Sequence, residues 1–274
     1  MSWIPQAVLE NIEVILIHDE SKDSTRLELE HLLLVNPSRK ITLREVKVQS
    51  PGLARNAGLE IVKTPWYAFA DADDFVCVPN LIQLLKDTIR SNSTLGMGSY
   101  LAINLKNGVE KEFAQPLARD DNKVLELASR MGLWRLVFST ESSGDVRFSA
   151  YRMAEDYLYI SQVLNHVEKV HSSRLIVYKY YYGGTSNLTS NKLVMPDMFG
   201  VLERIKEAQF ESCLALKFQS YAIQKLTLSI LKNTGTSLAL RSFPTLLKNL
   251  LSNPISLLLL ISSKHSRKVG ENES

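Results

Sequence analysis

Three aspartates follow an apolar run in the first third of the chain. The sequence WYAFA, residues 66–70, leads directly into Asp71, Asp73 and Asp74. Closely spaced carboxylates repel one another and are costly to desolvate. A divalent cation removes that repulsion, because Mg²⁺ or Mn²⁺ accepts one or two carboxylates and completes its coordination with water and phosphate oxygens. The cluster therefore indicates a Mg²⁺ or Mn²⁺ site.

The position of this cluster after a predicted strand helps to decide whether it binds a ligand. Side chains two residues apart on a strand face the same way, so Asp71 and Asp73 are predicted to point together from the carboxyl end of a strand at 66–70. Open α/β sheets bind their ligands outside those strand ends. Aspartates on a surface loop are more often merely solvated, and the motif alone leaves that alternative open.

Other polar residues are expected at strand ends or helix starts. Asp19 ends an apolar run at 12–17, where its carboxylate either accepts an N–H of a nucleobase or caps the next helix. Arg55 and Asn56 fall at the start of a helix predicted over 50–63. Backbone amides and a guanidinium there suit a diphosphate, although a lone arginine more often forms a surface ion pair.

Glu155 and Asp156 are expected near the start of a helix over 152–167. Acidic groups in that position complement the positive end of the helix dipole, which is the purely structural interpretation. The functional interpretation is a general base, since a carboxylate can take the proton of an attacking hydroxyl. The spacing alone does not decide between the two.

The elements that would position these residues alternate between strand and helix. Continuous apolar runs predict buried strands, and amphipathic runs between them predict helices, an order typical of an α/β sheet. Asn107 and Gly108 predict a hairpin turn. Strands are expected at 12–17, 41–48, 66–70, 131–139 and 174–187, a hairpin at 98–113, and helices at 27–34, 50–63, 80–90, 120–131 and 152–167 and from about 196 onward.

Length and composition are those of an ordinary globular protein. The chain has 274 residues, of which 45% are hydrophobic and 22% charged, enough for one large domain or a domain with an appendage. Its two cysteines show no metal-ligand spacing, which indicates a reducing compartment. No signal peptide and no apolar run of about 20 residues is visible. A cytoplasmic protein is expected.

The charges are unevenly distributed. Residues 190–274 carry 11 basic and six acidic side chains, and there is no acid between Glu211 and Glu271. Leucine-rich, basic helices over 210–268 suit the surface of an anionic membrane. The alternative is a helical region that covers the sheet and exposes a solvated basic face. Nothing indicates a nucleic-acid partner.

Several of these segments together resemble the inverting family-two glycosyltransferases. The resemblance lies in VILIHDESKDST, SPGLARNAGLEIVKTPWYAFADADDF and YRMAEDYLYISQVL, which occur in the family's order and spacing. It is specific over about 12–90 and looser over 130–187. It implies a GT-A fold, which is a three-layer α/β/α arrangement with a mostly parallel central sheet, here with a C-terminal helical extension.

The same resemblance implies a division of the chain. A glycosyltransferase domain is expected at 1–190, with a donor half near 12–100 and an acceptor half near 100–190. The basic region at 191–274 would follow it.

By position, the resemblance assigns donor-side roles to five residues. Asp19 is similar to the acid that contacts the base of the sugar nucleotide. Arg55 and Asn56 match the family's ARN stretch beside the donor. Asp71 and Asp73 match its DxD motif, which holds the metal, the ribose and the diphosphate, with Asp73 favoured as the direct metal ligand.

On the acceptor side, the resemblance assigns the catalytic base. Asp156 matches that base in the family's ED pair, with Glu155 beside it. Trp134 and Tyr178 fall where acceptor or sugar contacts occur in the family, although packing is the favoured role for both. The QxxRW signature of processive synthases is absent, which favours transfer of a single sugar.

Two features depart from the family. Its usual first strand and helix have no counterpart before residue 12, so the central sheet is expected to have an open edge and the nucleotide pocket to lack one wall. A misplaced start or a damaged copy would explain this. His18 replaces the first acid of the family's DD pair, which is expected to be tolerated because the base contact falls on Asp19.

The resemblance therefore predicts a metal-dependent, inverting glycosyltransferase (hexosyltransferase-like) of cell-surface polysaccharide or lipopolysaccharide synthesis. It would use a nucleotide-sugar donor, by analogy UDP-linked, and a glycan or lipid-linked acceptor, in the cytoplasm or peripherally on the inner membrane face. One alternative is a truncated, inactive relative that binds a membrane or a partner enzyme. A less favoured one is a haloacid-dehalogenase-type phosphatase, in which Phe75 would replace an expected Thr or Val.

Overall fold

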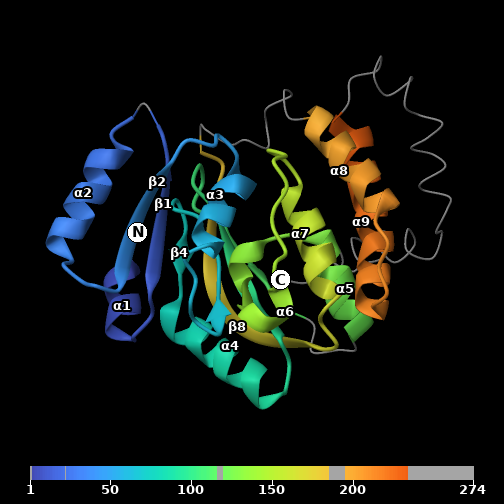
Figure 1. Ribbon diagram of the computed structural model, residues 1–274, viewed down its shortest axis with the longest axis horizontal. Coiled ribbons are helices and arrows are strands. Elements are labelled where there is room, and N and C mark those ends of the chain that lie inside the picture. Colours follow the sequence, from blue (N-terminus) through green and yellow to red (C-terminus); the bar gives the residue numbers. More distant parts are fainter. Residues whose placement is uncertain (1, 22, 116–119, 185–194, 234–274) are drawn as a thin grey trace.

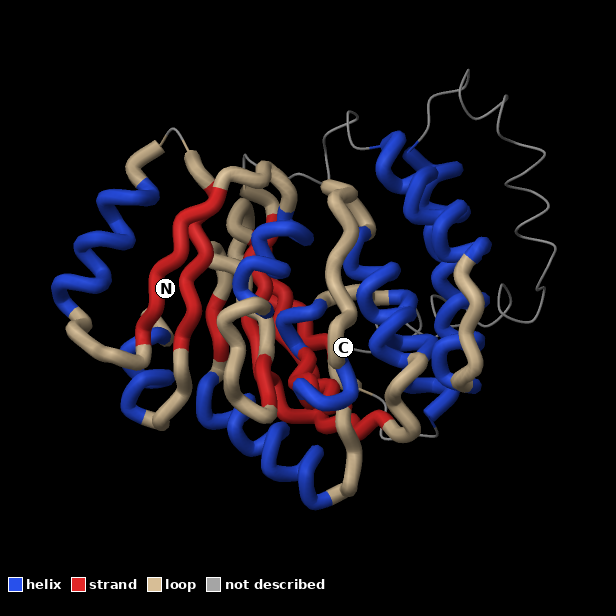
Figure 2. Tube along the Cα trace, in the orientation of Figure 1, coloured by secondary structure: helices blue, strands red, loops and turns tan. Residues whose placement is uncertain are grey.

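The computed structural model describes residues 2–21, 23–115, 120–184 and 195–233. A two-stranded sheet lies at one end, a six-stranded sheet in the middle and a group of helices at the other end (Figure 1). Figure 2 shows helices on both sides of the strands. The strands are β1 (Val14–Asp19), β2 (Ile41–Val46), β3 (Trp66–Tyr67), β4 (Phe75–Val76), β5 (Leu95–Asn104), β6 (Glu110–Phe113), β7 (Leu136–Ser139) and β8 (Val170–Tyr182).

Apart from α1 and α6, which the sequence did not predict, the helices follow the predicted positions with shifted ends. They are α1 (Ile4–Leu9), α2 (Thr25–Val35), α3 (Pro51–Leu59), α4 (Val78–Arg90), α5 (Asp120–Ser129), α6 (Thr140–Ser143), α7 (Glu155–Leu164), α8 (Met195–Glu207) and α9 (Cys213–Asn233), with a 3₁₀ turn at Leu133–Arg135. The helix predicted over 50–63 therefore ends at Leu59, and the one predicted over 152–167 begins only at Glu155.

Strands β1 and β2 are parallel neighbours joined through α2. Residues alternate between buried and half-buried along β1, which gives the strand one face toward the core. The register runs from Val14 opposite Ile41 to Asp19 opposite Val46. The Asp23 carboxylate accepts a hydrogen bond from the backbone N–H of Thr25, the first residue of α2, at 3.0 Å.

The second sheet is mixed rather than mostly parallel, which corrects the expectation for the central sheet. Its order is β3–β7–β5–β8–β4, with β6 paired to β5 at the side. In this described sheet, β5 and β8 are parallel, and the other pairs are antiparallel. A parallel pair needs a long crossover, whereas the predicted turn at Asn107–Gly108 closes β5 and β6 directly as a hairpin.

The strand predicted at 66–70 is much shorter than expected. Only Trp66 and Tyr67 pair with β7, and both are half-buried. The ladder ends here because the chain turns away, and the backbone N–H of Asp71 donates to the side-chain hydroxyl of Tyr178 at 3.0 Å instead of to a strand. The premise that Asp71 and Asp73 share one face of a strand is therefore wrong.

The two sheets are held together by side chains. Within the described residues they share no ladder of backbone hydrogen bonds. Buried residues from both form one apolar cluster, in which Val14, Leu16 and Ile41 lie with Val76 and Val177. The first sheet is therefore attached to the second through this cluster, and not as an extension of one continuous sheet.

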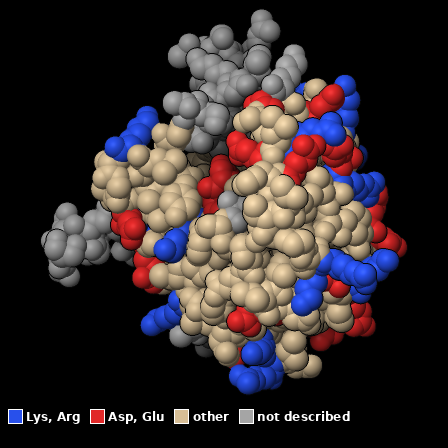
Figure 3. Space-filling model, turned by 90° about the vertical axis from the view of Figure 1, so that its left-hand side faces the viewer, with Lys and Arg blue, Asp and Glu red and all other residues tan. Residues whose placement is uncertain are grey.

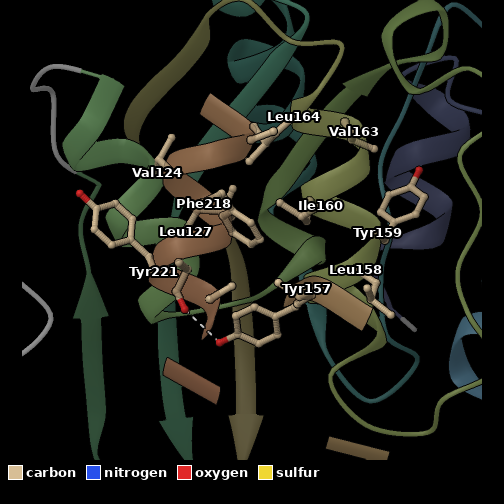
Figure 4. Packing of buried hydrophobic residues seen from close by; sticks show 14 of the residues in the cluster. Val124, Leu127, Tyr157, Leu158, Tyr159, Ile160, Val163, Leu164, Phe218 and Tyr221 are labelled. Carbon is tan, nitrogen blue, oxygen red and sulfur yellow. Dashed lines mark hydrogen bonds between the residues drawn. The ribbon is translucent and has the colours of Figure 1, made fainter. Parts of the chain in front are cut away.

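Helices α5, α7, α8 and α9 enclose the larger apolar cluster. Helix α7 is buried on two faces: Tyr157 and Ile160 lie toward Phe218 of α9, while Tyr159 lies on the other side (Figure 4). The Tyr157 hydroxyl donates to the carbonyl oxygen of Ala128 at 2.9 Å (Figure 4). Packing on two faces holds α7, so its first turn has a fixed position.

The described part of the basic C-terminal region belongs to this same cluster, through Val201 and Ile205 of α8 and Ala222 and Ile230 of α9. Residues 234–274, on which most of the predicted membrane-surface contact falls, lie outside the described residues. None of the helices in the described part is both long enough and apolar enough to span a membrane.

The end of the molecule formed by α1 and α2 exposes several large apolar side chains. Leu9, Leu27, Leu34 and Val35 are among the most exposed of this kind. Figure 3 shows this end, where charged side chains border a broad uncharged area. Most other large apolar side chains of the described chain lie in the two clusters.

Candidate active site

The first turn of α3 is packed closely against the segment that leads to α7. The Ser50 hydroxyl caps the helix by accepting from the Leu53 N–H at 3.4 Å, and Pro51 occupies the first turn, where no N–H is needed. A Cβ on Gly52 would lie 2.6 Å from the carbonyl oxygen of Ser149. Only glycine allows the two backbones to approach this closely.

Asn56 fastens the same helix to the same segment. Its side-chain amide donates to the carbonyl oxygen of Phe148 at 2.9 Å, and its carbonyl oxygen accepts from the Phe148 N–H at 2.8 Å. The Phe148 ring in turn stacks on Tyr159 of α7, with ring centroids 3.9 Å apart. Both polar atoms of the Asn56 side-chain amide are therefore hydrogen-bonded to the backbone of Phe148.

The Gly52 contact makes a testable prediction for stability. Gly52→Ala is expected to lower the free energy of unfolding by about 1–3 kcal/mol, because the new methyl group must push backbone atoms apart. Gly58→Ala, in the same helix, is the matched control. There the nearest atom to a new Cβ is 3.5 Å away, in ordinary contact, so this variant is expected to be neutral or slightly more stable. Urea unfolding checks both, and equal effects would contradict the proposed close approach.

Arg55 lies between two acidic groups that are far apart in sequence. Its Nη1 is 2.7 Å from Oε1 of Glu155, and its Nη2 is 3.3 Å from Oδ1 of Asp71. The guanidinium also lies over the Phe148 ring, 5.6 Å from its centroid. The side chain of Arg55 is 22% exposed and that of Glu155 is 9% exposed. This partly buried bridge joins the DxD motif to the start of α7.

The start of α7 holds two adjacent acids. Ala154, the residue before the helix, has φ +65°, a left-handed conformation that is unfavourable for a residue with a Cβ. Glu155 and Asp156 form the first turn, and Oδ1 of Asp156 accepts from the Tyr157 N–H at 2.9 Å. Both acids therefore lie at the positive end of the helix dipole.

The two acids differ in their surroundings. Glu155 has Arg55 as a direct counter-ion. The pKa of Asp156 is raised well above the usual range, first by burial and then by the negative charge of Glu155, and the more distant charge of Arg55 offsets this only in part. A carboxylate with a raised pKa holds a proton more readily near neutral pH, which suits a general base.

The aspartate turn is fastened to β8. Oδ1 of Asp74 accepts from the Tyr181 N–H at 2.8 Å, and Asp74 itself is buried. Burial raises the pKa of Asp74 to about 6, against the lowering effect of hydrogen bonds from Tyr181 and Tyr178. Asp71 is half-buried and Asp73 is exposed.

A divalent cation fits this turn. Asp73 is exposed and forms no hydrogen bond or ion pair within the described part of the chain, so its carboxylate is available as a ligand. Asp71 already faces Arg55. Two carboxylates with water and phosphate oxygens are a usual Mg²⁺ shell. No group of three or more His, Cys, Asp or Glu side chains suited to a metal occurs among the described residues, so any ion here would depend on its ligand for further oxygens.

Asp19 does not cap the next helix, which was one of its two predicted roles. Its Oδ1 accepts from the Val48 N–H at 2.8 Å and so joins the end of β1 to the segment after β2. Near the start of that helix, the first N–H donates to Asp23 instead. The hydrogen bond leaves the second oxygen of Asp19 free to accept from a nucleobase.

Trp134 and Tyr178 pack against each other. Their rings are stacked, with centroids 4.4 Å apart, and Tyr178 is fully buried. Tyr178 therefore has no surface for an acceptor, and the packing role holds for it. Trp134 is only half-buried and also stacks on Tyr180 at 5.5 Å.

The structure thus brings Arg55, Asp71, Glu155 and Asp156 together and adds residues that sequence reasoning missed. Phe148 carries no motif that could have marked it. Asp74 is buried and bonded to the Tyr181 N–H, and its place directly after the DxD pair was the one sequence signal for it.

Comparisons with known proteins agree on one family. The profile of glycosyl transferase family 2 matches residues 5–129. The poly(ribitol-phosphate) beta-glucosyltransferase of Bacillus spizizenii (strain W23) is 22% identical over 226 residues, which cover 79% of this chain and 35% of that protein. The chain therefore spans about a third of the length of this curated relative.

Solved structures share the fold. S. aureus TarS matches with a TM-score of 0.60 and 13% identity, over 92% of this chain and 49% of TarS. TarS in complex with UDP-GlcNAc matches with a TM-score of 0.58 and 15% identity, over 90% of this chain and 70% of that one. These likenesses confirm the GT-A fold expected from the sequence.

Proposed function

We propose that this chain, whose residues 5–129 match the model of glycosyl transferase family 2, transfers one sugar from a nucleotide-sugar donor to a glycan acceptor with inversion. The family match spans Asp71 and Asp73, which removes the support for a phosphatase. The observation that carries the proposal is the bridge formed by Arg55, which joins the DxD aspartate Asp71 to Glu155 in the first turn of α7, next to Asp156.

The proposed donor is UDP-linked. S. aureus TarS was solved with UDP-GlcNAc and with UDP, and its fold is shared here. Asp73 and Asp71 would hold a Mg²⁺ or Mn²⁺ ion, which when bound would offset the negative charge of the diphosphate. Arg55 would add positive charge on the same side, and the free oxygen of Asp19 would accept from the base.

The proposed base is Asp156. As the oxygen of an acceptor hydroxyl attacks the anomeric carbon, a bond forms on one face of the sugar and the bond to the diphosphate breaks on the other. The hydroxyl proton passes to the Asp156 carboxylate, and the electron pair of the broken bond leaves with the nucleoside diphosphate. Glu155 keeps Arg55 in place beside the base.

The proposed acceptor is a polymer of the cell-surface type. The curated relative is named for transfer to poly(ribitol phosphate), and a polyol-phosphate or lipid-linked polysaccharide is the class to test first. The division into a donor half, an acceptor half and a basic helical region, with contact to an anionic membrane face through residues 210–268, remains part of this proposal.

Calorimetry with UDP, with and without Mn²⁺, tests the donor side. The chain is expected to bind UDP more tightly with Mn²⁺, and Asp73→Ala is expected to bind equally weakly in both conditions. Glu168→Ala, at an exposed acid beyond the far end of α7, is the control and should bind like the unmodified chain. No binding of UDP, GDP, CDP or dTDP would instead favour an inactive relative that binds a membrane or a partner enzyme.

A further inference from the structure

The turn that carries Asp71 and Asp73 is fastened to β8 by one buried side-chain network. Tyr178, which is fully buried, lies at its centre. The Tyr178 hydroxyl accepts from the Asp71 N–H at 3.0 Å, and burial, helped by the neighbouring Asp74 carboxylate, raises the pKa of this hydroxyl. Asp74 also accepts from the Tyr181 N–H at 2.8 Å. Both ends of the turn are therefore bonded to the same strand.

The network leaves little freedom to the turn. Immediately after it, Val76 pairs with Tyr178 in the β4–β8 ladder, and the Cys77 N–H donates to the Val177 carbonyl oxygen at 2.9 Å. The Trp134 ring stacks on Tyr178, which holds the tyrosine in one orientation. Buried networks whose groups are all paired make the surrounding structure rigid.

We infer that Tyr178 and Asp74 are positioning residues, which touch no ligand but hold the backbone of the aspartate turn so that the Asp73 and Asp71 carboxylates can take a metal and a diphosphate together. This inference rests on the proposed function. Groups that orient metal ligands through hydrogen bonds typically change metal affinity by about 10- to 100-fold when removed, and the network here acts on the backbone of a ligand segment in the same way.

Tyr178→Phe tests the inference because it removes one oxygen and keeps the stacked ring. We expect it to weaken Mn²⁺-dependent UDP binding by about 10- to 100-fold, with little change in UDP binding measured without metal. Tyr180→Phe is the matched control. Its ring belongs to the same stack, and its hydroxyl makes no hydrogen bond in the described part of the chain, so its metal-dependent binding should equal that of the unmodified protein.

Asp74→Asn and Asp74→Ala give a second, independent measurement. Asparagine keeps an oxygen for the Tyr181 N–H, so we expect it to retain more of the metal-dependent affinity than alanine does. This pair also serves if Tyr178→Phe does not fold.

The outcomes separate the two proposals. If the unmodified chain binds UDP with Mn²⁺ and both Tyr178→Phe and Asp74→Ala bind it equally well, the positioning roles are overturned while the proposed function stands. If the unmodified chain binds no nucleotide with metal, the proposed function fails, and this inference fails with it.

Discussion

Asp156→Asn is expected to lower kcat by about 10²- to 10⁴-fold, the usual contribution of a general base, while Mn²⁺-dependent UDP binding stays unchanged. Asparagine keeps the size and the hydrogen bond to the Tyr157 N–H but cannot take a proton. The raised pKa of Asp156 places the acid limb of the pH–rate profile closer to neutrality than for an ordinary carboxylate, with activity lost as the pH falls.

The same variant is expected to gain stability at alkaline pH. A carboxyl whose pKa is raised in the folded state binds protons there that the unfolded chain has already released, so its contribution lowers the free energy of unfolding as the pH rises from about 3.9 through the raised pKa. Asparagine has no such cost. At pH 8 the variant should be more stable than the unmodified chain by about 1–2 kcal/mol, and this difference should shrink toward pH 4.

Urea unfolding at pH 4, 6 and 8, together with single-turnover assays, checks both parts. If Asp156→Asn retains turnover, Asp156 is not the catalytic base. Loss of UDP binding equal to that in Asp73→Ala would instead mean that the two acidic groups do not divide donor binding and proton transfer between them.

Arg55→Met is expected to cost about 3–5 kcal/mol of unfolding free energy near pH 8, the usual effect of removing one partner of a buried ion pair. Without the guanidinium, Glu155 and Asp156 remain adjacent and partly buried with no counter-ion. Arg55→Lys should recover only part of the loss, because one ammonium cannot reproduce the two separate contacts to Asp71 and Glu155.

A matched control lies close to Arg55 in the fold. Arg44 pairs with Glu60 at 2.8 Å, but its side chain is 38% exposed and that of Glu60 is 57% exposed, so Arg44→Met should cost no more than about 1 kcal/mol. The double change Arg55→Met with Glu155→Gln should restore part of the stability. Equal losses at the two arginines would show that the bridge contributes no more than a surface pair.

The pH dependence of Arg55→Met has a defined sign. The positive charge of Arg55 lowers the pKa of Asp156, so its removal raises that pKa further. The folded variant then holds a proton over a wider pH range than the unfolded chain. Its stability should therefore fall more steeply with rising pH than that of the unmodified protein.

The sequence predicted the order of elements better than the geometry of the site. The continuous apolar run at 12–17 and the Asn107–Gly108 turn predicted β1 and the β5–β6 hairpin, because local pattern determines both. The 66–70 run was predicted as a strand, yet only two of its residues pair. Phe69 instead packs half-buried in an aromatic cluster with Phe148, and an apolar sequence pattern does not distinguish that packing from a strand.

The site could be predicted only as separate pieces. Family motifs named Arg55 and Asp156, but the ion pair of Arg55 with Glu155 joins positions 100 residues apart, and no local rule gives such a pairing. Asn56 was assigned to the donor, whereas its side chain holds the Phe148 backbone.

The pair of hydrogen bonds between Asn56 and Phe148 joins positions 92 residues apart. This separation affects the order in which parts of the site form during synthesis. Contacts between distant positions form late, because a long loop must close before they can form. The family-matched segment ends at residue 129, before Phe148 and the acids of α7 have been made. The aspartate turn is itself fastened to Tyr178 and Tyr181, which follow the acids of α7 in the chain. Both the proposed metal-binding turn and the proposed base should therefore reach their final geometry only after β8 has been made.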